Sequence, residues 1–340
     1  MPKLDPLDIS FPQNQRPVSP LPKPVVAPAA TDEAVTIKAA DTFSSESLQR
    51  LENTAKKAVE YFRANFGPVN GPLNFEVGGA GLRTGYNPGE DTIFRPELGN
   101  VKNAGLESED VINHEIFHAL VLNAYPDLPK PGEAEESCIA MHEALADYFA
   151  YQLSPDPHFG ENYRTEQPHL REYHSELKLN LAPGSHAQGN AIVSMMLEHG
   201  VTNEEVREFL QAGDFRLEAL AKASPHFEQA LGEEQKLSVD SQVSEPYKTT
   251  PQNKYWMKSD VSLEVTFNPN ESMNEAFPNM RVVWTDKQGY PSKAYSVEEA
   301  EQNSFRITPS QNARVEKMLA TFYDGENVIG FRQFYFGVRD

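Results

Sequence analysis

Apolar side chains recur at helical intervals in the first patterned stretch of the chain, residues 44–66. Leu51, Ala55 and Val59 are spaced four apart, so they fall on one face of an α-helix. Gly67 follows the stretch directly, and glycine is a residue type that commonly ends helices. The pattern therefore predicts a helix over 44–66.

A second helical pattern follows Ser108, which is a good N-cap residue. Two acidic residues come next, where the helix dipole favours negative charge, and apolar residues then recur until Pro126 stops the run. Similar patterns predict three further helices, over 133–153, 187–199 and 203–211.

Strand-like runs occur in two places. Residues 71–100 contain the runs LNFEV and DTIFRP, which are separated by the turn sequence NPGE. From about residue 255 onward, short apolar runs alternate with turn residues and predict a β-sandwich. The first 40 residues are rich in proline, which is typical of an extended tail or linker. These patterns predict an α+β chain with a tail over 1–40, a main domain over 41–240 and a sandwich over 250–340.

Net charge narrows the range of partners. The chain has 30 basic and 50 acidic side chains and a net charge of −20, which argues against nucleic acid or an anionic membrane as a partner. No apolar run approaches the length that spans a membrane. The single cysteine, Cys138, excludes an intrachain disulfide. The first twenty residues contain no hydrophobic segment of the signal-peptide type, so the sequence leaves the localisation open.

The run INHEIFHALV lies within the helix that follows Ser108 and carries the first candidate chemistry. His114 and His118 are four residues apart, so on a helix they stand about 40° apart and one turn along the axis. Two imidazoles in that arrangement can bind one cation, and Glu115 beside them can take a proton from a water that the metal activates. Spacing alone leaves a second interpretation open, an ordinary buried helix that contains two histidines by chance.

The predicted helix over 133–153 offers a third ligand in the run HEALAD. Glu143 and Asp147 are four apart and share a face, so one carboxylate can bind the metal while the other holds a ligand imidazole. The alternative is a solvated acidic face. Apolar neighbours such as Leu145 and Phe149 argue against it, because buried acids need partners and a metal is one.

HEIFH followed by EALAD, with 24 residues between His118 and Glu143, resembles the gluzincin metallopeptidases and most closely the thermolysin-like neutral proteases. The resemblance covers about residues 50–235 and lies mainly in these motifs. It implies that His114, His118 and Glu143 bind zinc, that Glu115 is the general base, and that Asp147 supports a ligand histidine.

Two further segments resemble the same family. GSHAQGNAIVSMM resembles its later segment in which a histidine bonds the developing oxyanion, which implies that role for His186; capping the helix that begins near residue 187 is the alternative. HLREY resembles a Leu-Arg pair that contacts a substrate carbonyl oxygen, which implies substrate binding by Arg171. The chain departs from the family at His142, where asparagine is usual and where the histidine could compete as a ligand. The family's carbonyl-polarising tyrosine has no clear counterpart, and Tyr125 is the nearest candidate.

The resemblance implies a zinc-dependent endopeptidase with a zincin-type two-lobed domain, one Zn²⁺ per chain and a protein or peptide substrate, and it favours secretion. The sequence has no local calcium-loop motif, so Ca²⁺ is not indicated by the pattern. We expect the C-terminal β-domain to bind substrate or a partner. Two alternatives stay open: a catalytically inactive zinc-binding scaffold, and a zinc amidase that acts on cell-wall peptides.

Overall fold

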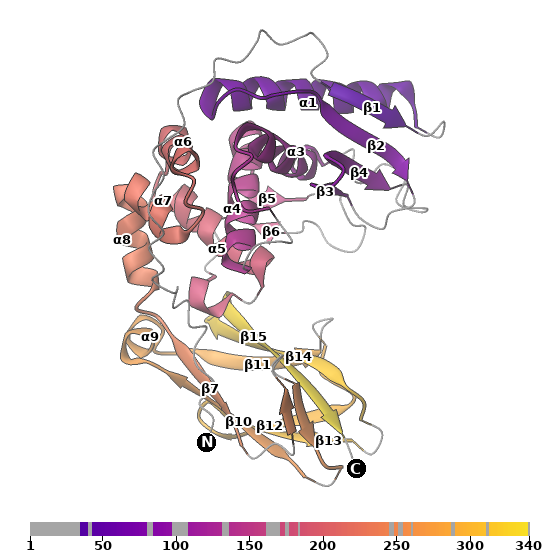
Figure 1. The fold of residues 1–340 in the computed structure, drawn as a ribbon. Helices are drawn as coiled ribbons and strands as arrows, with labels where there is room; N and C mark the ends of the chain where they lie inside the picture. Colours follow the sequence, from indigo (N-terminus) through magenta and orange to yellow (C-terminus); the bar gives the residue numbers. More distant parts are fainter. Residues whose placement is uncertain are drawn as a thin grey trace. The chain divides into compact units, whose positions relative to one another are not determined.

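The computed structural model describes most of the chain between residues 35 and 338. The described ranges are 35–39, 43–79, 84–96, 108–130, 136–160, 171–173, 177–182, 184–244, 248–250, 254–259, 261–286, 290–310 and 313–338. Helices and several sheets are both present, which confirms the α+β class (Figure 1). The chain divides into two compact units, one rich in helices and one rich in strands.

The helical unit contains one four-stranded sheet. Its strand order is β1 (Val35–Ala39), β2 (Leu73–Gly79), β4 (Thr92–Pro96) and β3 (Gly85–Asn87). The first three strands run parallel, and β3 pairs antiparallel with β4. In β2 the apolar side chains alternate with polar ones and are buried, as expected for a strand with one covered face. The short strand β3 is the last in this strand order, so it forms an edge of the sheet.

Strand β1 corrects one prediction, because Val35–Ala39 falls inside the region expected to be a tail. Its residues pair in parallel with Leu73–Val77 of β2. Val35 and Ile37 alternate with polar side chains, which is a strand pattern that the proline-rich composition of the preceding residues obscured. The tail prediction otherwise concerns residues 1–34, which lie outside the described part of the chain.

Seven α-helices are described in this unit. They are α1 (Ser45–Asn65), α3 (Glu109–Ala124), α4 (Glu136–Leu153), α5 (Ser185–Glu198), α6 (Asn203–Ala212), α7 (Leu217–Ala223) and α8 (Pro225–Glu234), the last of which leads into the other unit. The predicted helices are confirmed, and α6 begins with a capping box formed by Thr202 and Glu205. The short helices α7 and α8 were not predicted. A two-stranded pair, β5 (His158–Phe159) with β6 (Arg171–Glu172), completes the unit.

Helix α3 lies at the centre of this unit and packs against α1, α4 and the sheet. The ring of Phe117 lies 6.0 Å from that of Phe62 on α1 and 5.3 Å from that of Phe149 on α4, measured between centroids. Neighbours on several sides explain why α3 is buried around almost its whole circumference. The motif histidines are thereby held on one of the most enclosed elements of the chain.

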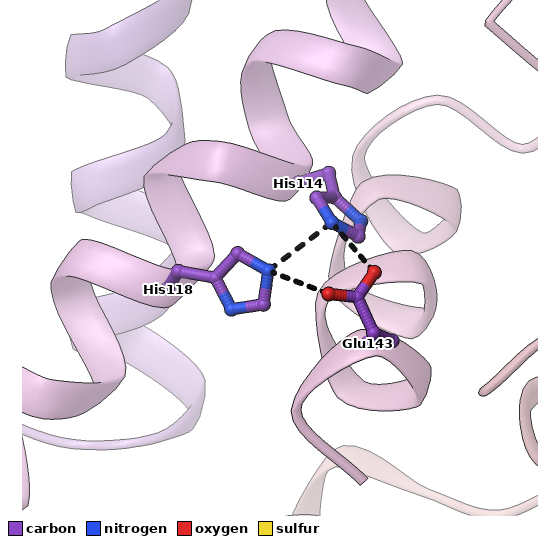
Figure 2. Close-up of side chains that lie close together, drawn as sticks. All are labelled: His114, His118 and Glu143. Carbon is purple, nitrogen blue, oxygen red and sulfur yellow. Dashed lines mark hydrogen bonds and ion pairs between the residues drawn. The ribbon is translucent and has the colours of Figure 1, made fainter. Parts of the chain in front are cut away.

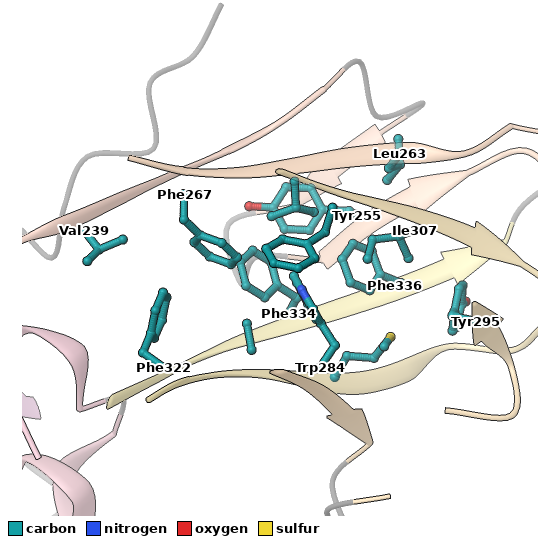
Figure 3. Close-up of a cluster of buried hydrophobic side chains, with 14 of the residues drawn as sticks. Val239, Tyr255, Leu263, Phe267, Trp284, Tyr295, Ile307, Phe322, Phe334 and Phe336 are labelled. Atoms are coloured by element: carbon teal, nitrogen blue, oxygen red, sulfur yellow. The ribbon is translucent and has the colours of Figure 1, made fainter. Parts of the chain in front are cut away.

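The strand-rich unit contains two sheets that share one core, the arrangement of a β-sandwich (Figure 3). One sheet has the order β12 (Tyr295–Glu301), β13 (Ser304–Pro309), β10 (Leu263–Pro269) and β7 (Val239–Val243). The other has the order β11 (Arg281–Asp286), β14 (Glu316–Asp324), β15 (Asn327–Val338), β9 (Lys254–Met257) and β8 (Lys248–Thr250). Aromatic side chains fill the shared core, and Phe334 stacks on Phe336. The unit is not purely β, because it also contains the short helix α9 (Glu271–Ala276) with Met273 buried.

The boundary between the units differs from the predicted one in two respects. The strand-rich unit begins at Gly232, before the predicted limit of 240, and it also takes in Ser175–Pro183, which precedes α5. That early segment contains the 3₁₀ helix η1 (Leu179–Leu181), and Leu181 is buried in the core of the sandwich. Ser175–Pro183 therefore belongs to the strand-rich unit, Gly184–Leu231 belongs to the helical unit, and the chain from Gly232 onward belongs to the strand-rich unit again.

Within the described ranges, none of the helices combines the length and the apolar character that a membrane crossing needs.

Candidate metal centre

Helices α3 and α4 bring three potential ligands together (Figure 2). Nε2 of His114 lies 3.1 Å from Nε2 of His118 and 3.4 Å from Oε2 of Glu143, and Nε2 of His118 lies 3.9 Å from Oε1 of Glu143. One such group of three metal-binding side chains is found in the described residues, and its ligand atoms all lie within 4.8 Å of one another. The predicted ligands His114, His118 and Glu143 thus form a cluster that could hold a metal.

The spacing of these atoms suits a small divalent cation. Ligand atoms about 2.0–2.1 Å from a tetrahedral zinc are separated from each other by roughly 3.3–3.4 Å. The two imidazole nitrogens are separated by nearly that distance, and Glu143 presents one carboxylate oxygen to each of them, at 3.4 Å and 3.9 Å, so rotation of the carboxylate could bring one oxygen toward both. Two imidazoles and one carboxylate are also the donor set of several catalytic zinc sites. The residues present therefore fit a small divalent cation such as zinc.

Asp147 orients the first candidate ligand, His114. Its Oδ1 lies 2.7 Å from Nδ1 of His114, and the Asp147 side chain is fully buried. A proton on Nδ1 donated to this carboxylate leaves the Nε2 lone pair of the neutral ring directed at the cluster. Burial disfavours the imidazolium, but the charges of Asp147 and Glu143 outweigh it and raise the pKa of His114 to about 10. The surroundings of this ring therefore favour positive charge, which a bound proton or a bound cation can supply.

The pKa of Glu143 shifts in the opposite sense. Burial alone would raise it, but the neighbouring imidazoles of His114, His118 and His186 hold the pKa of this carboxyl well below its usual range. Glu143 is therefore ionised across the physiological pH range. An anionic carboxylate only 8 % exposed and surrounded by imidazole nitrogens is a strong ligand for a divalent cation.

Glu115 differs from its neighbours on α3. Every other residue from Val111 to Leu122 is buried, whereas Glu115 is half-buried. Its Oε2 accepts a hydrogen bond of 2.9 Å from the backbone N–H of Tyr86 in β3. The edge of the sheet thus fixes the carboxylate of Glu115, which follows the candidate ligand His114 in sequence. The motif identified Glu115, but nothing in the sequence indicated that Tyr86 would hold it.

His186 lies at the start of α5, and its side chain is 71 % exposed. Its Nε2 lies 3.4 Å from Oε2 of Glu143, which brings this histidine to the same cluster. The alternative role of helix capping is wrong, because α5 begins at Ser185, its N-cap is Gly184, and no side chain caps it. His186 is therefore an exposed imidazole beside the buried candidate ligand Glu143.

Gly189 explains how α5 comes so close to α4. A β-carbon at this position would lie 2.7 Å from Cβ of Glu143 and 3.1 Å from the backbone oxygen of Ala140. Real β-carbons do not approach other atoms so closely, so only glycine permits this helix contact. Gly189 was not predicted as a site residue, although the glycine in SHAQGNAIV, one turn after His186, was a visible signal.

His142 is not part of the cluster. Its Nε2 lies 2.6 Å from the backbone oxygen of Pro129, and its ring packs 4.4 Å from the ring of Phe215, between centroids. Burial lowers the pKa of His142, so the ring is neutral. Tyr125 is also directed elsewhere, because its hydroxyl donates to the backbone oxygen of Phe66. His142 therefore does not compete as a metal ligand. The Tyr125 hydroxyl is likewise not directed at the cluster, as a carbonyl-polarising tyrosine would be.

The backbone of Arg171 lies next to a residue that borders the site. It pairs with Phe159 in the β5–β6 ladder, and the ring of Phe159 lies 5.5 Å from the ring of His114, between centroids. The side chain of Arg171 lies outside the described part of the structure, so its contact with substrate stays a prediction. The ring of Phe159 packs beside His114, and the ring of Tyr173 packs beside Phe159. The sequence patterns identified neither aromatic residue as part of the site.

The geometry of the site is the main guide to its chemistry, because sequence comparison adds nothing to it. No protein-family model matches this chain, and no curated protein is significantly similar to it in sequence.

Proposed function

We propose that this protein is a zinc-dependent endopeptidase with a zincin-type two-lobed catalytic domain. The observation that carries the proposal is the position of Glu115. It directly follows a candidate ligand, His114, in a stretch of α3 that is otherwise buried from Val111 to Leu122, and the Tyr86 N–H fixes it while it remains partly exposed. A site that only stabilised the fold would have no need of a partly exposed carboxylate beside its ligands.

Three side chains would hold the zinc: His114, His118 and Glu143. The closeness of their ligand atoms, all within 4.8 Å of one another, supports this assignment, and the His114–Asp147 contact is the support that ligand histidines usually have. Bound there, zinc would supply Lewis acidity, which makes water nucleophilic at neutral pH and polarises a carbonyl group.

Glu115 acts as the general base in this proposal. Its carboxylate accepts a proton from the attacking water and then delivers that proton to the amine that leaves. The hydrogen bond from Tyr86 keeps the carboxylate in one orientation, so less freedom is lost when the substrate arrives. His186 donates a hydrogen bond from Nε2 to the oxygen on which negative charge develops.

Strand β3 is suited to bind the substrate backbone. It lies at one end of its sheet and contacts α3, which carries the proposed base. An extended peptide can add to such an edge as a further strand, held by main-chain hydrogen bonds. The Tyr86 N–H on this strand donates to the Glu115 carboxylate, so a peptide bound along β3 would run past Glu115 and would pair through main-chain groups of the strand other than this N–H. Arg171 is a further candidate contact for the substrate.

One observation favours the inactive scaffold as a second candidate. His186 lies 3.4 Å from Glu143, and a fourth protein ligand would close the site in the manner of a structural zinc. The zinc amidase would use the same residues on a different bond. The scaffold predicts zinc binding without cleavage of any substrate, and the amidase predicts cleavage of cell-wall peptides alone.

The full chain, loaded with zinc, is incubated with casein, with a short blocked peptide and with a cell-wall peptide. Endopeptidase activity predicts cleavage of the first two, loss of cleavage with a chelator, and recovery when zinc is restored. The matched variant Glu115→Gln should keep its zinc and lose turnover, because an amide cannot accept the proton. Cleavage of the cell-wall peptide alone would identify an amidase. Zinc binding at full stoichiometry without cleavage of any substrate would identify a scaffold and overturn the proposal.

A further inference from the structure

The turn between β3 and β4 holds Tyr86 by its side chain. The Tyr86 hydroxyl donates to Oδ1 of Asp91 at 2.8 Å, and Asp91 directly precedes β4, so this bond closes the hairpin. Burial, and then the bond to Asp91 and its charge, raise the pKa of Tyr86 well above its usual range. The hydroxyl therefore stays protonated and remains a donor across the physiological pH range.

Asp91 is also joined to an inner strand of the same sheet. Its backbone oxygen accepts a hydrogen bond of 3.2 Å from Nδ2 of Asn74 on β2. Its φ of 44° lies in the left-handed region, which is costly for most residues with a side chain but is tolerated best by asparagine and aspartate. The contacts of Asp91 with β2 and β3 compensate for this conformation, so the residue occupies a fixed place between the two strands.

Strand β3 needs such support because it is short. It is three residues long and lies at the edge of its sheet, where Gly85–Asn87 pairs with β4. A short hairpin ladder is only marginally stable by itself. The backbone N–H of Tyr86 is the group on this strand that donates to Oε2 of Glu115, at 2.9 Å. Any contact that fixes Tyr86 therefore also fixes the donor that orients the Glu115 carboxylate.

We propose that Asp91 is a positioning residue for Glu115: by holding the Tyr86 side chain, it fixes the backbone N–H that orients this carboxylate. The inference rests on the proposed function, in which Glu115 is the general base. The two hydrogen bonds of Tyr86 form one path, from Asp91 through the tyrosine to Glu115. A misplacement of about 1 Å at a catalytic group can cost roughly a hundredfold in rate, so loss of this support should be measurable.

Substitutions at both ends of the Tyr86–Asp91 bond separate the hydrogen bond from backbone strain. Asp91→Gly removes the acceptor but adopts a positive φ without strain, and Tyr86→Phe removes the donor but keeps the ring and the backbone N–H. We expect each to lower kcat of the zinc-loaded full chain about tenfold, with unchanged zinc content and little change in KM. Asp91→Asn should stay near wild type, because its amide oxygen can accept the same bond and asparagine tolerates a positive φ. An equal loss of kcat in Asp91→Asn and Asp91→Gly would overturn the inference, since the hydrogen bond would then not be the cause.

Each substitution has a matched control in the strand-rich unit. Asn303, in the turn between β12 and β13, has a φ of 61°, so Asn303→Gly makes a similar backbone change. The Tyr295 hydroxyl donates to the backbone oxygen of Arg314 at 2.8 Å, so Tyr295→Phe removes a tyrosine hydrogen bond of the same length. Neither bond nor turn involves a residue of the candidate site, and both controls should leave kcat and KM near wild type. Losses of kcat as large as those of Asp91→Gly and Tyr86→Phe would refute the specific role of Asp91.

Amide hydrogen exchange follows the same path without turnover. In the metal-free protein the Tyr86 N–H should be protected, although it lies on an edge strand, because it is bonded to Glu115. Asp91→Gly and Tyr86→Phe should speed exchange at position 86. The amide of Val206, which bonds the backbone oxygen of Thr202 in α6, should exchange as before. Unchanged exchange at position 86 in both variants would overturn the inference.

A double variant tests whether the path is a single one. If Asp91 acts through Tyr86, then Tyr86→Phe combined with Asp91→Gly should lose no more kcat than either substitution alone. Multiplying losses would show that the two residues act independently and would overturn the inference. A raised KM with normal kcat in the single variants would assign the turn to substrate binding and would overturn it as well.

Glu115→Gln separates this inference from the function on which it rests. Full turnover in Glu115→Gln would refute the role of Glu115 as the general base. Loss of turnover in Glu115→Gln, together with normal kcat in Asp91→Gly and Tyr86→Phe, would leave the proposed function standing and refute only the positioning by Asp91.

Discussion

Gly189 of α5 faces Glu143 of α4 so closely that a β-carbon on the glycine would lie 2.7 Å from Cβ of the glutamate. The contact joins two parts of the proposed site, because Glu143 is a candidate ligand and His186 lies one turn before Gly189 on the same helix. The distance between these two helices therefore decides whether the histidine and the ligand lie close together.

Gly189→Ala should separate the two helices. The obstructing atoms include the backbone of Ala140 and Ala144, so the new methyl group cannot be accommodated by side-chain rotation. We expect a loss of about 1–3 kcal/mol of stability, the usual cost of overpacking, and a clear fall in kcat. Gly232→Ala on α8 is the matched control, because a β-carbon there meets no atom within 4 Å. It should be neutral or stabilise by up to about 1 kcal/mol. Thermal unfolding and peptide cleavage measure both effects, and normal values for Gly189→Ala would contradict the packing argument.

Asp147→Asn tests the support of the first ligand. The buried carboxylate lies 2.7 Å from Nδ1 of His114, and an amide of the same shape keeps the packing but removes the charge. We expect zinc affinity to fall about tenfold to a hundredfold, because the His114 imidazole loses basicity and its fixed orientation. Competition with a chromogenic chelator measures this affinity. Asp156→Asn is the control. Asp156 is the exposed partner of His158, so its substitution should leave zinc affinity unchanged.

Zinc binding should release a proton from His114. Its pKa of about 10 in the metal-free protein means that the ring is protonated at pH 8, where an ordinary histidine is neutral. Zinc must displace the Nε2 proton, so the apparent affinity should rise with pH through the neutral range and level off above about pH 10. Calorimetry at pH 8 in buffers of different ionisation enthalpy measures the number of protons released. Release of no proton at this pH would show that His114 is neutral before zinc binds.

Sequence patterns identified the three candidate ligands because each lies on a strongly patterned helix. The separation of His114 and His118 follows from helix periodicity, and Glu143 lies on a second strongly patterned helix. The position of Gly189 against Glu143 depends instead on the distance between two helices, which no local pattern encodes. The segment around Leu181 was assigned to the wrong unit for a similar reason: it packs on Gly330, which lies far away in the sequence.

His186→Ala is the substitution that best separates a catalytic centre from a structural zinc site. His186 lies 3.4 Å from Glu143, so it could serve either as an oxyanion donor or as a fourth ligand. If it is a donor, the variant should keep its zinc affinity and lose kcat by about a hundredfold or more, the usual cost of removing one oxyanion contact. KM should change little, because the hydrogen bond strengthens only as charge develops in the transition state. If it is a ligand, zinc affinity itself should fall. His199→Ala is the control, since His199 ends the same helix, and its removal should leave both zinc affinity and kcat near wild type.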